Sequence, residues 1–163
     1  MQKSITLEYS SPLCRPAPAA SDTEHVLNVT VVYEDAAACQ WAREAYNQMV
    51  IGAGKQTVRG TWWKLEELSH PPVLAGAVSK AMRADVIVVA IRTTEGFPLP
   101  FYVWVNSWLP HRVHGAGTLV ALIATPDQTG LNRRRAADYL RAVARRARMH
   151  FQITERSVVR DAA

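Results

Sequence analysis

The chain has only two cysteines among its 163 residues, Cys14 and Cys39, which excludes a disulfide framework and a cysteine-based metal centre. It also has no apolar run near the roughly 20 residues that a membrane-spanning helix needs. Residues 1–20 hold no continuous apolar segment of the kind that directs secretion. From these absences we expect a protein of the reducing cytoplasm that does not enter a membrane.

Features that would name a reaction are missing as well. No Gly/Ser/Thr-rich loop that could cradle a phosphate follows a predicted strand, and no nucleophile is paired with a base. His111 and His114 have the spacing of helical metal ligands, but Pro110 and nearby glycines place them in a loop. We therefore predict no catalytic residues and no metal site.

The first 25 residues differ from the rest of the chain. Proline and serine recur there and large apolar side chains are few, so we predict a flexible N-terminal tail over residues 1–25. The remaining residues, 26–163, have the length of one domain.

Strand and helix patterns alternate after the tail. Continuous apolar runs over 27–33, 86–91 and 119–124 predict buried strands. Alternating patterns over 56–65 and 151–154 predict strands at the edges of the sheet. Apolar spacing predicts helices over the ranges 36–51, 71–82, 100–109 and 132–149.

Local signals fix some details of these elements. Asp35 is expected to cap the first helix and Ser69 the second. Cys39, on the apolar side of the first helix, is expected to be a small core residue. Trp62 and Trp63 are expected to point to opposite faces of their strand.

The alternation of strands and helices predicts a parallel sheet with right-handed crossovers. Placing the most apolar strands in the middle gives a three-layer α/β sandwich with a five-stranded parallel sheet in the order 2-1-3-4-5. Ligands of such sheets bind beyond the carboxyl ends of the strands, where the strand order reverses. The candidate ligand-binding residues at this switch point are Glu34, Asp35, Arg92, Thr93, Thr94, Glu95, Thr125 and Asp127.

One segment resembles a known family. The run ADVIVVA from Ala84 to Ala90, a loop ending at Leu99-Pro100, and a helix containing Trp104 and Trp108 resemble the central part of flavodoxin-like FMN reductases. The resemblance implies the flavodoxin-like fold and FMN as a cofactor. That family has a Ser/Thr/Gly-rich phosphate loop after its first strand, whereas this chain has the acidic sequence EDAAA over 34–38. Two carboxylates at that position oppose the binding of a phosphate.

The acid pair Glu34-Asp35 and the pair Thr125-Pro126 also resemble strand ends of response-regulator receivers, in which acids hold Mg²⁺. Receivers carry a phospho-accepting Asp after strand three, where this chain has Ala90 and Ile91, and the lysine expected after strand five is missing too. We therefore predict a non-catalytic binding or interaction module, flavodoxin-like or degenerate receiver-like, with no cofactor. The alternative is an FMN-dependent oxidoreductase with an atypical phosphate site.

The predicted helix 100–109 has an unusual outer face. Its inward stripe is apolar and aromatic, and its opposite face contains no charged residue, whereas surface helices normally carry charges there. An uncharged outer face is typical of a buried interface, so we predict a homodimer. The interface candidates are Tyr102, Val103 and Asn106.

The predicted helix 132–149 is rich in arginine. Residues 131–150 contain seven arginines and one acid, Asp138. The anion-binding candidates on one outer stripe are Arg134, Arg141, Arg145 and Arg148. Such a stripe can bind an acidic protein, a phosphate-bearing partner or nucleic acid, or can be no more than a solvated helix face.

Overall fold

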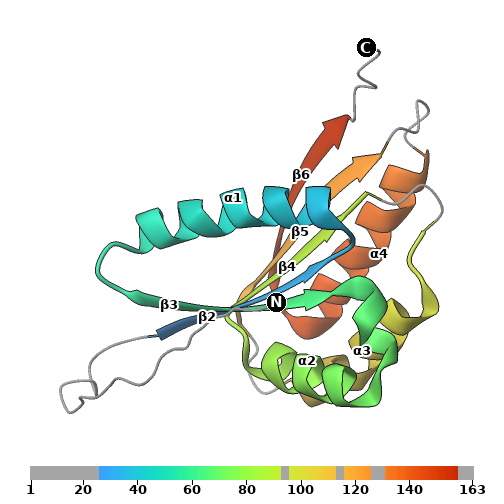
Figure 1. The fold of residues 1–163 in the computed structure, drawn as a ribbon, viewed down its shortest axis with the longest axis horizontal. Coiled ribbons are helices and arrows are strands. Elements are labelled where there is room, and N and C mark those ends of the chain that lie inside the picture. The colour runs from blue at the N-terminus through green and yellow to red at the C-terminus, as the bar shows by residue number, and fades with distance from the viewer. Residues whose placement is uncertain (1–25, 93–95, 113–115, 126–130, 158–163) are drawn as a thin grey trace.

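The computed structural model describes residues 26–92, 96–112, 116–125 and 131–157 (Figure 1). No helix within these ranges is long and apolar enough to cross a lipid bilayer. The elements run in the order β2 (Val26–Tyr33), α1 (Ala36–Ala53), β3 (Thr57–Lys64), the 3-10 helix η3 (Leu65–Ser69), α2 (Pro71–Arg83), β4 (Val86–Ile91), α3 (Leu99–Trp108), the 3-10 helix η4 (Leu109–His111), β5 (Thr118–Thr125), α4 (Leu131–Ala147) and β6 (His150–Ser157).

The five strands form one parallel sheet in the order β3-β2-β4-β5-β6, which confirms the predicted order 2-1-3-4-5. The connection from β2 to β3 runs toward one edge of the sheet, and the later connections run toward the other edge. Because crossovers between parallel strands are right-handed, α1 and the other three helices must lie on opposite faces. Figure 1 shows α1 on one side of the sheet and α2, α3 and α4 on the other.

Each face of the sheet has its own apolar core. Alternate residues of the central strands point to opposite faces, so Val31 and Val88 pack under α1, whereas Val32 and Val89 pack under α2, α3 and α4. Trp62 joins the core under α1 and Trp63 the core under α2, as the sequence predicted.

Of the helices in the described residues, α1 alone covers its face of the sheet, and β6 presents polar side chains on that face (Figure 1). Gln152 and Thr154 are exposed there. Arg156, two residues further on, lies with its guanidinium carbon 4.5 Å from the ring centroid of Trp41 and its Nη2 3.8 Å from a carboxylate oxygen of Glu44.

Several predicted details are wrong. Ser69 does not cap α2: it ends the unpredicted 3-10 helix η3 and donates its hydroxyl hydrogen to the carbonyl of Glu66, while His70 holds the cap position without a side-chain bond. The last strand is longer than predicted, because its polar second half also pairs with β5, as far as Thr125 opposite Ser157. Helix α4 ends at Ala147, and Arg148 has a φ of 60°, which stops the helix.

Arg112 holds the amino-terminal edge of the sheet together. Its guanidinium donates to the carbonyl oxygens of Ala81 (2.9 Å), Ala84 (2.7 Å) and Ala116 (2.7 Å). The first two carbonyls belong to the buried C-terminus of α2, where the Ala81 carbonyl also accepts the N–H of Ala84 at 3.4 Å. Burial lowers the pKa of Arg112, but a guanidinium starts so high that it stays charged.

Gly117 makes this arrangement possible. Its φ is 116°, and a Cβ there would lie 2.7 Å from Nη2 of Arg112 and 2.8 Å from the carbonyl oxygen of Asp85. The same carbonyl accepts from the N–H of Thr118. Arg112, Gly117 and the Asp85 carbonyl thus pack together at the amino-terminal edge of the sheet.

We predict that Arg112→Met lowers the free energy of unfolding by about 2–3 kcal/mol, because carbonyls at the buried end of α2 lose a charged donor. Arg83→Met is the matched control: it removes an exposed arginine from the last turn of the same helix and should cost less than about 0.5 kcal/mol. Urea titration followed by circular dichroism measures both. Equal stability of the two variants would contradict this role of Arg112.

Candidate functional site

The switch point of the sheet lies between β2 and β4. These strands pair in parallel with Tyr33 opposite Ala90, so their following residues leave the sheet side by side. The N–H of Glu34 donates to the carbonyl of Ala90 at 3.0 Å and extends the pairing by one step. The sequence prediction that the ends of these two strands meet is therefore confirmed.

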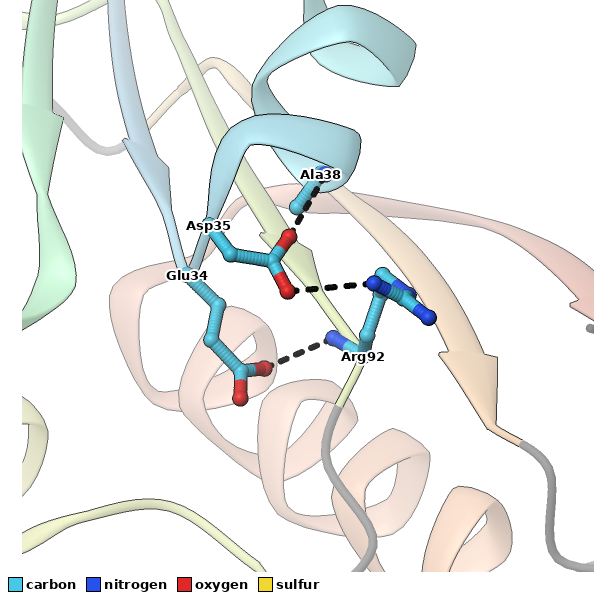
Figure 2. Close-up of polar contacts among 4 residues, drawn as sticks. All are labelled: Glu34, Asp35, Ala38 and Arg92. Atoms are coloured by element: carbon cyan, nitrogen blue, oxygen red, sulfur yellow. Dashed lines mark hydrogen bonds and ion pairs between the residues drawn. The ribbon is translucent and has the colours of Figure 1, made fainter.

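Three charged residues contact one another at this point (Figure 2). A carboxylate oxygen of Glu34 accepts the backbone N–H of Arg92 at 2.7 Å. Oδ2 of Asp35 lies 3.2 Å from Nη1 of Arg92, while Oδ1 accepts the N–H of Ala38 at 2.9 Å. Asp35 is thus both the N-cap of α1, as predicted, and one half of an ion pair.

This contact fills the N-terminus of α1 with the protein's own carboxylate. The free N–H groups and the dipole of a helix N-terminus favour an anion, and Asp35 supplies that anion. Glu34 and Asp35 carry two negative charges against the single positive charge of Arg92. A phosphate brought to this position would meet excess negative charge and an occupied helix end.

The other candidates at this edge are less defined. Thr125 is the last residue of β5 and its backbone lies at the same edge, opposite Ser157. Thr93, Thr94, Glu95 and Asp127 lie outside the described residues, as does His114. Within the described ranges, no three His, Cys, Asp or Glu side chains gather closely enough to hold a metal ion. Ligand binding by the switch-point residues stays a prediction.

The outer face of α3 is uncharged. The helix begins at Leu99, one residue earlier than predicted. Leu99 has 73% of its surface exposed and Val103 has 41%, and Asn106 is exposed further along. Tyr102, on the same face, is half-buried rather than exposed, because its ring packs edge-on against Tyr139 of α4 with the ring centroids 5.1 Å apart. The sequence analysis missed Leu99 and the link between the two helices, since a contact between separate helices has no local sequence signal.

An aromatic cluster joins α3 to α4. Phe97 stacks on Phe101 with centroids 4.2 Å apart, and Tyr102 and Tyr139 complete the cluster. Burial raises the pKa of the Tyr139 phenol, so it stays protonated at neutral pH. The cluster fixes the position of the uncharged α3 face relative to the arginines of α4.

Three of the four predicted anion-binding arginines, Arg134, Arg141 and Arg145, are exposed on α4 at the spacing of one helix face. The fourth, Arg148, lies beyond the end of the helix. Arg141 contacts Asp138 at 3.0 Å and lies 5.2 Å from the ring centroid of Phe151, so it is partly engaged within the chain. Arg133 likewise pairs with Glu155 at 3.1 Å. Binding of an acidic or phosphate-bearing partner by the remaining arginines stays a prediction.

A hollow that the sequence analysis missed lies beside the N-terminal half of α1. It has a volume of about 420 Å³ and reaches the ends of β2 and β3. Cys39 lines it and is half-exposed, so its assignment to the core was wrong. The i, i+3, i+4, i+7 spacing of its helix residues places them on one face of α1, but spacing does not show whether that face is covered. The lining residues are Tyr33, Ala36, Cys39, Gln40, Arg43 and Lys64.

The arrangement of strands and helices can be compared with that of known proteins. No family model and no curated protein matches the sequence. An apo NADH:FMN oxidoreductase (EMOB) superposes with a TM-score of 0.60 at 14% identity, over 80% of this chain and 74% of that chain. The chain has a flavodoxin-like fold.

Two further solved structures agree with this assignment. An oxidoreductase from Corynebacterium diphtheriae has a TM-score of 0.63 at 13% identity, covering 86% of each chain. A short-chain flavodoxin associated with a non-canonical PDU bacterial microcompartment has a TM-score of 0.61 at 14% identity, over 81% of this chain and 84% of that chain. The expected flavodoxin-like resemblance is therefore confirmed at the level of the fold.

We predict that the two roles of Asp35 separate on mutation. Asp35→Ala removes both the helix cap and the ion pair and should cost about 1–2 kcal/mol of stability. Asp35→Asn keeps a capping oxygen and loses only the half-exposed ion pair, so it should cost less than about 1 kcal/mol. Thermal and urea unfolding measure both variants. If Asp35→Asn is as destabilised as Asp35→Ala, the ion pair rather than the cap is what Asp35 contributes.

Proposed function

We propose that this flavodoxin-like chain acts by binding rather than by catalysis, and that its switch point does not hold FMN through the loop after β2. The observation that carries the proposal is the contact among Glu34, Asp35 and Arg92. The carboxylate of Asp35 caps α1 and contacts the guanidinium of Arg92. The carboxylate of Glu34 accepts the backbone N–H of Arg92, just after β4. These groups do not fit the phosphate of a flavin nucleotide.

The second candidate function is an FMN-dependent oxidoreductase with a different phosphate site. It is favoured by the names of the structural neighbours, which include an NADH:FMN oxidoreductase and a flavodoxin. Identities of 13–14% support a common fold and do not identify the ligand. The choice between the two functions therefore rests on the chemistry of the switch-point residues.

The direct test is a titration of the purified full-length chain with FMN, followed by quenching of flavin fluorescence. We expect a colourless protein and no saturable binding at micromolar FMN, because the carboxylates repel the phosphate. A yellow protein that retains FMN one-to-one after gel filtration would contradict the proposal and favour the oxidoreductase.

A paired variant tests the physical cause. Glu34→Ser with Asp35→Ser removes both charges and keeps a capping hydroxyl at the start of α1. This double variant should bind inorganic phosphate or FMN more tightly than the parent chain. The control, Glu44→Ser, removes an exposed carboxylate from a later turn of the same helix and should leave binding unchanged. Equal effects in the two variants would show that only net charge matters.

We also propose that the chain self-associates through the outer face of α3. No residue from Leu99 to Trp108 is charged, so two copies of this helix can meet around a two-fold axis without repulsion. The exposed apolar surface of Leu99 and Val103 supplies the contact, and Asn106 lies on the same face. A second copy of the chain is therefore the proposed occupant of this surface.

Val103→Glu tests the dimer. It places a charge in an apolar contact and should weaken association by at least a few kcal/mol, while the core residues of α3 stay in place. Val50→Glu is a matched control, since Val50 is also 41% exposed but lies at the far end of α1. Light scattering at low micromolar concentration measures both. A monomeric parent chain, or a Val103→Glu variant that stays dimeric, would contradict this interface.

A further inference from the structure

The hollow beside α1 is formed by one helix face and two strand ends. Ala36, Cys39, Gln40 and Arg43 lie on the same side of α1, one helical turn apart. Tyr33 ends β2 and Lys64 ends β3, the outermost strand of the sheet. The hollow therefore lies at the carboxyl-terminal edge of the sheet, where ligands of this class of fold bind. It is next to the switch point, but Glu34, Asp35 and Arg92 are not among its lining residues.

Its polar lining can donate hydrogen bonds. Arg43 and Lys64 are cations with donors only, and the amide of Gln40 and the phenol of Tyr33 can donate as well. Burial raises the pKa of Tyr33, so its hydroxyl keeps a proton to donate at neutral pH. Among the described residues, no carboxylate lines the hollow. A set of donors with two positive charges suits a ligand that is rich in acceptors and negatively charged.

The two cations are held near the hollow but are not neutralised. The guanidinium carbon of Arg43 lies 5.7 Å from the ring centroid of Trp62, a contact that orients the side chain and leaves its charge free. Nζ of Lys64 lies 3.8 Å from a carboxylate oxygen of Glu66, whose side chain is 75% exposed. Such an exposed pair is weak, so an incoming anion can replace Glu66 at little cost.

We propose that this hollow binds a small organic anion, with Arg43 and Lys64 holding a phosphate or carboxylate group and Gln40 and Tyr33 orienting it. Its volume of about 420 Å³ is in the range of small-molecule sites. The inference rests on the proposed function, because it names the class of ligand that the binding module takes. It requires no flavin and no contact with Glu34, Asp35 or Arg92.

Cys39 provides a reporter inside the hollow. In the full chain carrying Cys14→Ser, it is the only thiol, and its rate of alkylation by iodoacetamide reports access to the hollow. Two probes are added separately, inorganic pyrophosphate and citrate, each against sodium chloride of equal ionic strength. We expect at least a fivefold, saturable slowing of alkylation by one of the probes. Protection by pyrophosphate assigns a phosphate-bearing ligand, and protection by citrate a carboxylate.

Variants show whether the protection is local. Arg43→Gln and Lys64→Gln should each raise the probe concentration for half-protection at least tenfold. Lys55→Gln removes the same charge from an exposed position outside the hollow and should leave it unchanged. Calorimetric titration of the unmodified chain with the same probe should give the same affinity. Absence of protection beyond the salt control, or equal weakening by all three variants, would overturn the site.

The two proposals fail separately. The FMN titration reports on the switch point through flavin fluorescence, whereas alkylation of Cys39 reports on the hollow. FMN bound one-to-one with no effect on Cys39 would overturn the proposed function and leave the anion site standing. Failure of both anion probes in a chain that does not bind FMN would overturn the anion site alone.

Discussion

The parallel pairing of β2 with β4 is the constraint on which the rest of the site depends. Because Tyr33 lies opposite Ala90, the next residues of both strands leave the sheet together, and two acids meet one arginine. Asp35 then caps α1 with its carboxylate, and the carboxylate of Glu34 accepts the backbone N–H of Arg92 just after β4. At the switch point, the start of α1 is therefore occupied by a carboxylate that belongs to the chain.

Much of the fold was predictable from the sequence because its signals are strong and local. The apolar runs at β2, β4 and β5 are continuous, as strands buried on both faces must be, and they fixed the sheet order. The errors arose where local signals compete. Ser69 lies shortly before two prolines and is a residue type that often caps helices. It is instead the last residue of the 3-10 helix η3, so His70 takes the cap position of α2. Arg148 continued the helical charge pattern, but its left-handed backbone lies outside α4.

The candidate site was predictable only in part. Glu34, Asp35 and Arg92 follow directly from strand order, since residues at the ends of neighbouring parallel strands must meet. The hollow beside α1 was not predictable, because it depends on how far α1 leaves β3 uncovered. Helical spacing alone made Cys39 a core residue, and only the packing of α1 on the sheet shows that this side of the helix faces a polar cavity.

The central claim is that Asp35 occupies the anion position at the start of α1. The backbone amide of Ala38 reports on this most directly, because it donates to that carboxylate at 2.9 Å. In a ¹⁵N–¹H correlation spectrum of the full chain, the account predicts that the Ala38 signal does not move when FMN is added in excess. A saturable shift of that signal at one equivalent of FMN, with the flavin bound, would contradict the account.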